Sequence, residues 1–298
     1  PSRPAHAKSC CGIDDFDDAR RSAAKLGIPH YVLDFEEVFT RTVVERFAGE
    51  YARGRTPNPC VSCNNFVKLG TLVQYADRFN ARYVATGHYA RIERGADGAH
   101  LYRNPHAKDQ AYALAQLAPE QLDRLLLPLG ELDKTRTRAE ARRLGLPVHD
   151  KAESMDVCFV EGGDYRHVLA RLRPEINVGG AVVTGGGVRV GEHAGIANYT
   201  IGQRTKLPAR GEGARYVTRI DAATNTIVVG REDELLSTEL LADEVNLIRP
   251  ERFVGETAVR AMIRYRSEPT PASALIGDDG LLRLRFKSPV RAVSPGQL

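Results

Sequence analysis

Apolar residues in the first part of the chain recur at two different spacings, which predicts strands and helices in alternation. Helical spacing predicts a helix over 64–79, and further helices are expected over 17–26 and 36–52. Short apolar runs predict strands at 31–35 and 82–86, the first of them buried. Strands that alternate with helices are typical of a parallel α/β sheet.

The pattern changes in the second half of the chain. Two more helices are expected, over 111–126 and 137–144, and a shorter one over 164–172. From Val178 onward the sequence is rich in glycine and β-branched residues, with turn residues between short apolar runs. This predicts all-β structure, and the last set of strands, which includes one at 257–264, is expected to form a small barrel.

These changes divide the chain into three expected domains. We expect a parallel α/β domain over 1–160, a central β domain over 161–235 and a C-terminal β-barrel over 236–298. No apolar run approaches the roughly 18 residues that a membrane helix needs, and no secretory leader pattern opens the chain. We therefore expect a cytoplasmic protein without a membrane partner.

Charge adds one observation. The formal net charge is only +4, but the stretch from Arg249 to Arg291 holds nine basic and five acidic residues. A basic module of this kind is compatible with contacts to a phosphate backbone. A solvated basic face is the alternative interpretation of the same residues.

The five cysteines indicate thiol chemistry rather than a disulfide framework, because their number is odd and the chain is long. Cys63 stands at the start of the helix predicted over 64–79, after the rigid Pro57-Asn58-Pro59 sequence. A thiol near the positive end of a helix has a lowered pKa, which favours the reactive thiolate. A buried, inert cysteine is the alternative at this position. Cys158 lies in an apolar stretch, where a cysteine is usually part of the core.

Two further interpretations of the thiols stay open. Cys10, Cys11, Cys60 and Cys63 make up four thiols, the number that a structural zinc site uses, although an adjacent pair is a poor half-site. The Cys60-x-x-Cys63 pair also has the spacing of a redox dithiol. A structural zinc site would fit an RNA-binding protein that is not an enzyme.

Three polar segments are candidates for ligand contacts. Thr86-Gly87-His88 ends the strand predicted at 82–86, and ligands of open α/β sheets bind beyond the carboxyl ends of strands. Lys108-Asp109-Gln110 precedes a predicted helix, which Asp109 can cap. Arg264-Tyr265-Arg266 pairs cations with an aromatic ring, a combination suited to RNA. A turn, a helix cap and a solvated strand are the respective alternatives.

Nine short segments follow one another in a specific order. They are Gly54-Arg55-Thr56-Pro57-Asn58-Pro59, Cys63-Asn64, Ala85-Thr86-Gly87-His88-Tyr89, Lys108-Asp109-Gln110, Val157-Cys158-Phe159, Gly191-Glu192-His193, Thr200-Ile201-Gly202-Gln203-Arg204, Arg264-Tyr265 and Pro295-Gly296-Gln297. Each segment alone is a weak signal. In this order, and over essentially the whole chain, the sequence resembles the bacterial tRNA-specific 2-thiouridylases.

The resemblance implies a fold and a reaction. The fold would be an ATP-pyrophosphatase α/β domain followed by a central β domain and a C-terminal β-barrel. In the reaction, ATP with Mg²⁺ adenylates the C2 oxygen of the wobble uridine of tRNA, and a persulfide sulfur then replaces AMP. The implied partners are tRNA and a sulfur-donor or relay protein such as a cysteine desulfurase.

The resemblance also implies roles for single residues. Cys158 would carry the persulfide, and Cys63 would be the nucleophile that frees its sulfur, through a Cys63–Cys158 disulfide or as hydrogen sulfide. Gly87 would touch ATP. The target base would be surrounded by Asn58, Pro59 and Cys60, and the tRNA would be contacted by His88, Lys108, Asp109, Gln110, Arg264, Tyr265 and Gln297. No residue is expected to hold a resident metal.

Two departures from the family pattern matter. The Ser-Gly-Gly-x-Asp-Ser loop that holds the ATP phosphates does not occur, so we expect a chain incomplete at its N-terminus, with an incomplete last barrel. Cys60 stands where some relatives carry an aspartate. With Cys63 and Cys158 it leaves an iron–sulfur cluster open as an alternative. A related enzyme that adds sulfur at another tRNA position or to a small molecule is the nearest rival.

Overall fold

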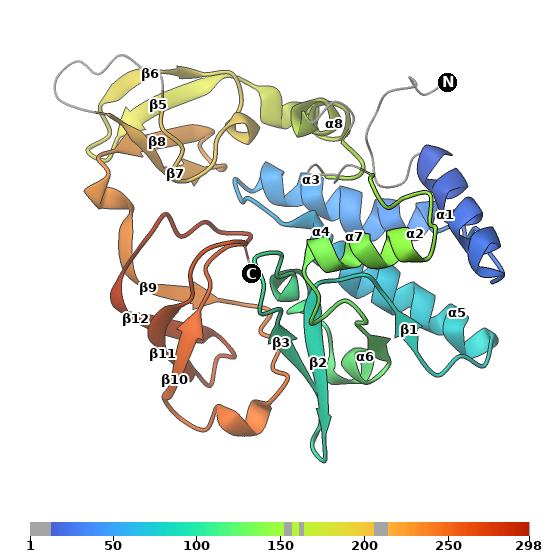
Figure 1. Cartoon of the computed structure of the whole chain (residues 1–298). Coiled ribbons are helices and arrows are strands. Elements are labelled where there is room, and N and C mark those ends of the chain that lie inside the picture. The colour runs from blue at the N-terminus through green and yellow to red at the C-terminus, as the bar shows by residue number, and fades with distance from the viewer. Residues whose placement is uncertain (1–12, 152–156, 161–163, 206–213, 298) are drawn as a thin grey trace. The chain divides into compact units, whose positions relative to one another are not determined.

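The structure is a computed structural model, which describes residues 13–151, 157–160, 164–205 and 214–297 (Figure 1). The chain forms two compact units. The first comprises residues 1–44 and 59–168, and the second comprises residues 45–58 and 169–298. Segment 45–58 therefore belongs with the second half of the chain, an association that the local sequence pattern does not indicate.

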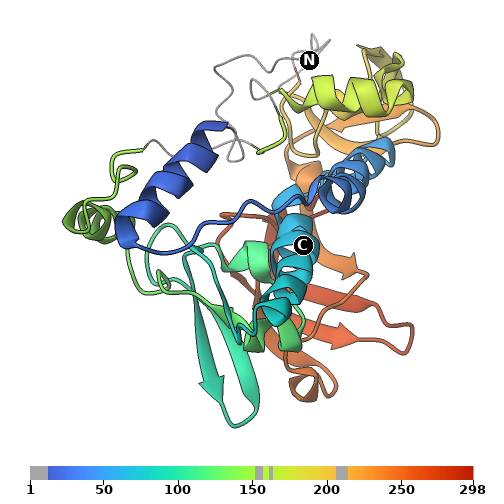
Figure 2. The same cartoon turned by 90° about the vertical axis from the view of Figure 1, so that its right-hand side faces the viewer.

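The first unit is built from helices around a short parallel strand pair. Its elements are α1 Ile13–Leu26, α2 Glu36–Phe39, η1 Thr40–Val44, α4 Pro59–Ser62, η2 Cys63–Thr71, α5 Leu72–Arg78, β1 Val84–Ala85, β2 Ala90–Gly95, β3 Gly98–Arg103, η3 Ala111–Leu114, α6 Pro119–Asp123, β4 Leu125–Leu126 and α7 Lys134–Arg143. Strand β1 pairs in parallel with β4, which confirms the predicted α/β class. Strands β2 and β3 form an antiparallel hairpin whose turn extends past the helices of this unit (Figures 1 and 2).

Several helix ends follow from local sequence. Helix α1 ends at Leu26 because Gly27 adopts a positive φ of 68°, and α7 ends before Gly145 with a φ of 65° for the same reason. Glycine adopts this left-handed conformation without the steric cost that other residues meet. Both stops agree with the sequence prediction.

The buried strand predicted at 31–35 is wrong. These residues are irregular, and Tyr31 and Val32 are exposed by 66% and 63%. The aromatic rings of this segment instead pack at α5 and its end: Phe35 lies 5.3 Å from Tyr75 in α5, and Tyr31 lies 5.6 Å from Phe79, the residue after α5. An apolar run becomes a strand only when a partner strand binds its backbone, and no strand in the described part of the chain pairs with this segment.

The helix predicted over 111–126 is also wrong, because it is interrupted. Only η3, a 3₁₀ helix, and α6 form, and strand β4 follows. Pro119 takes the first position of α6 and leaves Ala118 extended, with a ψ of 154°. A residue before proline avoids the helical conformation, so the proline separates the two helices.

One continuous helical segment carries Cys60 and Cys63. It runs through α4, η2 and α5, and its middle part is a π-helix. Gly70 permits the wide turn, because a Cβ atom there would lie 2.9 Å from the carbonyl oxygen of Asn65. The amide of Gln121 donates to the carbonyls of Asn65 and Leu69, at 3.0 and 2.9 Å. A side chain from α6 thus satisfies carbonyl groups of this wide helix.

The second unit is mostly β structure. Its elements are α3 Glu45–Ala52, η5 Pro174–Asn177, β5 Gly180–Thr184, β6 Arg189–His193, η6 Ile196–Asn198, β7 Tyr216–Asp221, β8 Thr226–Gly230, η7 Asp233–Leu235, β9 Leu236–Ala242, η8 Pro250–Arg252, β10 Thr257–Ala261, β11 Thr270–Ile276 and β12 Leu282–Arg291. Helix α8, Tyr165–Leu172, contains the division between the units. The strand orders are β6-β5-β8-β7 and β10-β11-β12-β9.

Each sheet of the second unit has its own apolar core. Val182, Val217, Ile227 and Val229 are completely buried in the first sheet. Phe286 forms the centre of the second core, with Ala272 and Val290 against it. Helix α3 contacts η5 and η6 and buries Phe47 and Tyr51, which explains why this early segment belongs to the second unit. In the described part of the chain, no helix has the length and apolar character to cross a membrane.

Candidate functional site

Cys63 does not lie at the start of a helix, so that prediction is wrong. The helical segment begins at Pro59, and Cys63 follows in the next turn. Proline is favoured at the first helical position, because its missing N–H would have no partner there. The unpaired N–H groups of the helix start are therefore nearer to Cys60. Residues three apart share one helix face, so Cys60 and Cys63 lie on the same side of the segment.

The two thiols differ in exposure. Cys60 is exposed, whereas Cys63 is half-buried. Burial by the surrounding protein atoms raises the pKa of the Cys60 thiol, and the positive charge of Lys68 lowers it by less. Part of the residue still faces solvent, so partial desolvation by neighbouring atoms, and not complete burial, raises the thiol pKa. Cys60 is therefore a protonated, neutral thiol at pH 7.

His88 is also neutral. Burial lowers the pKa of its ring to about 4, and the charge of Lys68 adds to the effect. The ring Nδ1 lies 2.8 Å from Oγ1 of Thr86, which fixes the orientation of the imidazole. Lys68 shifts the pKa of both Cys60 and His88, so its charge acts on both groups. The positive charge of Lys68 therefore acts both on Cys60, a predicted target-base residue, and on His88, a predicted tRNA contact.

Gly87 lies directly after the parallel strand β1. Thr86 continues the strand pairing through its N–H, which donates to the carbonyl of Leu126 at 3.0 Å. A Cβ atom at Gly87 would meet only Cδ1 of Leu129, at an ordinary 3.6 Å. Packing within the protein therefore does not require a glycine here, whereas a ligand lying against the backbone would. This strand end is compatible with the predicted contact to ATP.

Gln110 holds the segment that follows His88. Its backbone N–H donates to the carbonyl of Tyr89 at 2.8 Å, and its side-chain Oε1 accepts from the N–H of Tyr89 at 2.9 Å. The two predicted tRNA-contact segments, His88 and Lys108-Asp109-Gln110, are therefore joined by a pair of hydrogen bonds. The side-chain oxygen of Gln110 is used within the protein, and its role in the loop was not apparent from the sequence.

Asp109 organises the loop that precedes Gln110. Its carboxylate accepts from the N–H groups of Asn104 and Ala111, at 2.8 and 3.2 Å, and from Nε of Arg103 at 2.9 Å. The expected capping interaction is thus present, although the helix that follows is only the short 3₁₀ helix η3. The carboxylate already accepts three hydrogen bonds, so its role in shaping the loop is evident from the structure alone.

Cys158 lies in a turn rather than in a strand-like core segment. The N–H of Val160 donates to the carbonyl of Val157 at 2.9 Å, and Cys158 is half-buried. The neighbouring ring of Phe159 packs against Phe39 of α2, with 5.8 Å between ring centroids. Helix α2 in turn contacts the π-helix that carries Cys63. Both predicted catalytic cysteines therefore belong to the first unit and are connected through α2; Ser154, Met155 and Asp156 lie outside the described residues.

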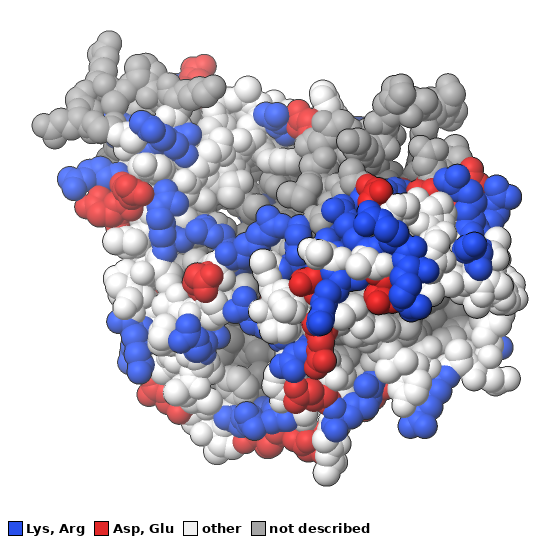
Figure 3. Space-filling view, in the orientation of Figure 1, with Lys and Arg blue, Asp and Glu red and all other residues white. Residues whose placement is uncertain are grey.

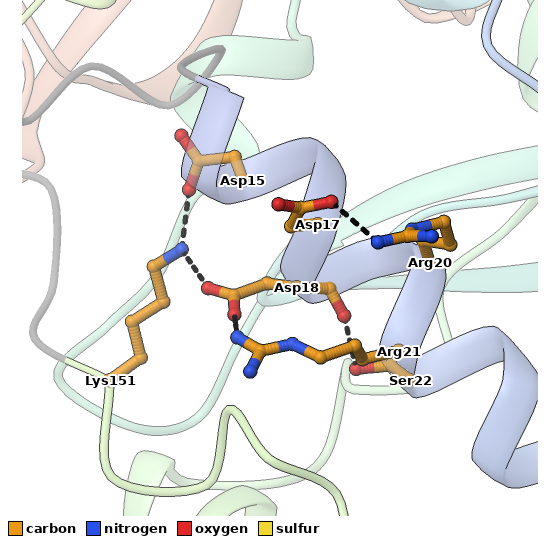
Figure 4. Close-up of polar contacts among 7 residues, drawn as sticks. All are labelled: Asp15, Asp17, Asp18, Arg20, Arg21, Ser22 and Lys151. Atoms are coloured by element: carbon orange, nitrogen blue, oxygen red, sulfur yellow. Dashed lines mark hydrogen bonds and ion pairs between the residues drawn. The ribbon is translucent and has the colours of Figure 1, made fainter.

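An ion-pair cluster holds Lys151 against α1. Lys151 contacts the carboxylates of Asp15 and Asp18 on α1, and Asp18 also pairs with Arg21 (Figure 4). Hydrogen bonds from Lys151 and then Arg21 lower the pKa of Asp18, and those to Asp15 and Asp18 raise the pKa of Lys151. The cations remain exposed, Lys151 by 42% and Arg21 by 62%, so water screens these ion pairs, and the cluster fixes a position more than it stabilises the fold.

Helix α7 presents a basic surface next to Tyr89. Its basic residues are Lys134, Arg136, Arg138, Arg142 and Arg143, against the single acidic Glu140, and none of its residues is buried. The hydroxyl of Tyr89 donates to Oγ1 of Thr137 at 3.0 Å, and Nζ of Lys134 lies 5.9 Å from the Tyr89 ring. Figure 3 shows the blue side chains gathered over α7.

In the second unit, Gln297 contacts the loop of residues 55–58, which contains the predicted target-base residue Asn58 and is called the target-base loop. Its Nε2 donates to the carbonyl of Thr56 at 2.6 Å, and the N–H of Thr56 donates to the carbonyl of Pro295 at 2.8 Å. Thr56 lies two residues before Asn58. The sequence contains both segment 54–59 and Pro295-Gly296-Gln297, but no local pattern indicates that these two segments contact each other.

Arg264 and Tyr265 lie in a turn, so the strand predicted over 257–264 is wrong at its end. Strand β10 ends at Ala261, and Ser267 N–H closes the turn onto the carbonyl of Arg264 at 3.1 Å. The turn exposes Tyr265 by 39%, and the guanidinium of Arg266 lies 5.2 Å from its ring. A turn presents both cations and the ring more openly than a strand would.

Metal binding finds little support in the described residues. Among residues 13–151, 157–160, 164–205 and 214–297, no three or more His, Cys, Asp or Glu side chains are grouped to hold a metal ion. Cys60, Cys63 and Cys158 are all described, so the structure does not assemble the ligand set of an iron–sulfur cluster from them. Cys10 and Cys11, which the zinc alternative requires, lie outside the described residues.

Comparison with known families divides the chain into three matched regions. Residues 2–162 match the tRNA methyl transferase HUP domain, residues 166–231 the tRNA methyl transferase PRC-barrel domain, and residues 237–298 the aminomethyltransferase beta-barrel domain. The parallel strand pair and the two four-stranded sheets agree with this order of domains. The fold and site thus define a protein of the tRNA-modifying class. It consists of a HUP domain followed by two small barrel domains.

Curated relatives narrow the class to one family. The tRNA-specific 2-thiouridylase MnmA of Clostridium perfringens is 40% identical over 289 residues, which cover 97% of this chain and 80% of the relative. The MnmA of Geobacter metallireducens is 43% identical over 97% of this chain and 79% of the relative. That of Pelotomaculum thermopropionicum is 40% identical over 100% of this chain and 83% of the relative. The chain belongs to the family of tRNA-specific 2-thiouridylases.

Proposed function

We propose that this protein catalyses the ATP-dependent 2-thiolation of the wobble uridine of tRNA. The observation that carries the proposal is the similarity to relatives named tRNA-specific 2-thiouridylase, at 40% identity or more over nearly the whole chain. The presence of both Cys63 and Cys158 in the first unit, connected through α2, supports the same reaction.

The two cysteines carry the sulfur-transfer steps of the proposal. Bound ATP, with Mg²⁺, supplies the adenylyl group that turns the uracil C2 oxygen into a leaving group. The terminal sulfur of a persulfide on Cys158 attacks C2, and AMP leaves with the oxygen. The thiolate of Cys63 then attacks Sγ of Cys158, which forms a Cys63–Cys158 disulfide and leaves the sulfur on the base. A cellular dithiol must reduce this disulfide before the next turnover. In the alternative order, Cys63 first releases the sulfur as hydrogen sulfide.

The neutral groups near Lys68 fit the recognition of an uncharged base. A protonated Cys60 thiol and a neutral His88 ring offer hydrogen-bonding groups without a full negative charge. A uracil ring carries no charge at neutral pH, so it needs no ionic partner. We propose that Asn58, Pro59 and Cys60 line the place of the target base and that Gly87 lies against the ATP.

Two surfaces are proposed to bind the tRNA backbone and bases. In the first unit, His88, Lys108, Asp109 and Gln110 are proposed to contact the tRNA. Tyr89 lies between His88 and the basic helix α7, because it follows His88 in the chain and its hydroxyl donates to Thr137 of α7, whose cations would contact phosphates. In the second unit, the exposed turn of Arg264 and Tyr265 offers cations and an aromatic ring for stacking.

The remaining features of the proposal follow from the reaction. We propose a sulfur-donor or relay protein such as a cysteine desulfurase as partner, and a cytoplasmic location where tRNA and ATP meet. We also propose domain boundaries at 160 and 235, for domains over 1–160, 161–235 and 236–298. The matched regions 2–162, 166–231 and 237–298 support this division.

The test uses the full-length protein, an unmodified tRNA transcript, ATP, Mg²⁺ and a persulfide donor, with the product nucleosides analysed by mass spectrometry. Wild-type protein should yield 2-thiouridine at the wobble position, whereas C63S and C158S should yield none while they still bind tRNA. A methylated base, or sulfur at another position, would refute the proposed reaction. Wild-type thiolation by either variant would refute the two-cysteine mechanism, and stoichiometric zinc with no activity would favour the RNA-binding alternative.

A further inference from the structure

The loop before Asn58 is held by the last described residues of the chain. Thr56 uses both of its backbone polar groups for this contact: its N–H donates to the carbonyl of Pro295 at 2.8 Å, and its carbonyl accepts from Nε2 of Gln297 at 2.6 Å. The contact is confined to the second unit, which includes both segments. A pair of hydrogen bonds to one residue fixes both its position and the orientation of its peptide planes.

The residues just before Thr56 are held by other parts of the same unit. Nε of Arg55 pairs with Oε2 of Glu50 at 2.8 Å, and its NH2 group lies 3.9 Å from Oδ1 of Asp243. Gly54 adopts a φ of 72°, and a Cβ atom there would lie 2.8 Å from Cγ2 of Ile220 on β7. The loop thus packs against the sheet β6-β5-β8-β7 at Gly54, and it is hydrogen-bonded to the C-terminal segment at Thr56.

Gly296 makes the close approach possible. A Cβ atom at this position would lie 2.9 Å from the nitrogen and 3.0 Å from the carbonyl carbon of Thr56, both of which are backbone atoms. Gly296 also adopts a φ of 92°, which other residues rarely do. Two independent constraints therefore require glycine between Pro295 and Gln297.

We propose that Pro295-Gly296-Gln297 is a positioning segment, which sets the conformation of the target-base loop by holding Thr56, and that Gln297 acts through Thr56. This inference rests on the proposed function. Pro57 and Pro59 each restrict φ to one narrow range, so few free rotations separate Thr56 from the start of α4. Fixing Thr56 therefore limits the conformation of Pro57 and Asn58, which lead to the start of α4.

The rival explanation is that Gln297 only contacts the tRNA. The two explanations differ in what a variant changes. Loss of a direct contact weakens tRNA binding, whereas loss of a positioning contact slows sulfur transfer in tRNA that is already bound. They also differ before tRNA is added, because only a positioning role loosens the Thr56 loop in the protein alone.

The experiment compares G296A with the matched control G255A in the full-length protein. Gly255 also has a positive φ, of 76°, but no atom lies within 4 Å of its would-be Cβ, so G255A carries the conformational strain without the clash. Three quantities are measured: hydrogen exchange of the peptide that contains Thr56, the Kd for an unmodified tRNA transcript, and the single-turnover rate of 2-thiouridine formation at saturating tRNA. Q297A serves as a second variant that keeps the backbone free of clashes.

We expect G296A and Q297A to speed exchange at Thr56 and to lower the single-turnover rate by roughly 10- to 100-fold, with an unchanged tRNA Kd. G255A should match wild type in all three. A weaker Kd for Q297A with wild-type exchange and rate would overturn the proposal in favour of a direct tRNA contact. Faster exchange with a wild-type rate would also overturn it. If wild-type protein formed no 2-thiouridine, the proposed function itself would fail, and the exchange data would still decide whether this segment holds the loop.

Discussion

The neutral state of His88 yields a prediction whose magnitude follows from the structure. Its ring pKa is lowered from 6.5 to about 4, first by burial and then by Lys68. At about 1.4 kcal/mol for each tenfold change in proton affinity, the folded protein disfavours the protonated ring by about 3 kcal/mol. This value is an upper limit, because His88 is only half-buried and water screens part of the effect.

The sign of the pH dependence follows from proton uptake. Above pH 6.5 the ring is neutral in both the folded and the unfolded chain, so His88 costs no stability there. Between pH 6.5 and about 4 the unfolded chain takes up a proton that the folded protein does not, so stability falls as the pH falls. Below about pH 4 both states are protonated and the loss is complete.

The assay is an NMR titration of the histidine rings in wild-type protein, with H88Q to assign the signal. We expect the His88 signal to stay neutral down to pH 5. In K68M its pKa should rise only part of the way to 6.5, because burial is the larger cause. H167Q is the matched control, since the His167 side chain is 85% exposed, and it should keep the wild-type loss of stability below pH 6.5. A His88 ring that titrates near 6.5 in the folded protein would refute this reasoning.

Three further predictions concern stability and binding. Q121A removes the donor to two carbonyls of the π-helix and should cost about 1–3 kcal/mol in urea unfolding, whereas Q121E keeps the size but not the donor and should cost at least as much. G130A should prevent folding of the first unit, because its Cβ would lie 2.3 Å from the carbonyl oxygen of Ala90. The control is G49A, whose Cβ would meet no atom within 4 Å and which lies in a helix. G49A should be neutral or should stabilise the protein by up to about 1 kcal/mol. R136E on α7 should weaken tRNA binding and reduce its salt dependence, measured as Kd against salt concentration, with R20E on α1 as the control.

Each of these predictions can fail in a definite way. Wild-type stability of Q121A would mean that other groups satisfy the π-helix carbonyls. A folded G130A protein would show that the turn after β4 moves more easily than the structure indicates. If R136E and R20E weakened tRNA binding equally, the loss of affinity would come from the change in net charge and not from the surface of α7.

Local sequence was sufficient where neighbouring residues decide the structure. Gly27 and Gly145 end helices because only glycine adopts their backbone conformation easily. The short strands of the second unit follow from apolar and β-branched runs that turn residues separate. The ordered motifs around Cys63 and Cys158 were sufficient to indicate the family, because they depend on residue identity alone.

Tertiary structure decided the features that depend on distant partners. The apolar segment at Tyr31 and Val32 did not form a strand, because a strand needs another strand to bind its backbone, and the ring of Tyr31 packs against Phe79 instead. The neutral state of His88 depends on how much protein surrounds it, which no local pattern contains. Gln297 and Thr56 are 241 positions apart, so only the folded second unit shows that one motif holds the other. The sequence by itself determined which groups are proposed to carry the chemistry. The tertiary structure determined which residues hold one another in place, because hydrogen bonds and burial join residues that the chain order keeps far apart.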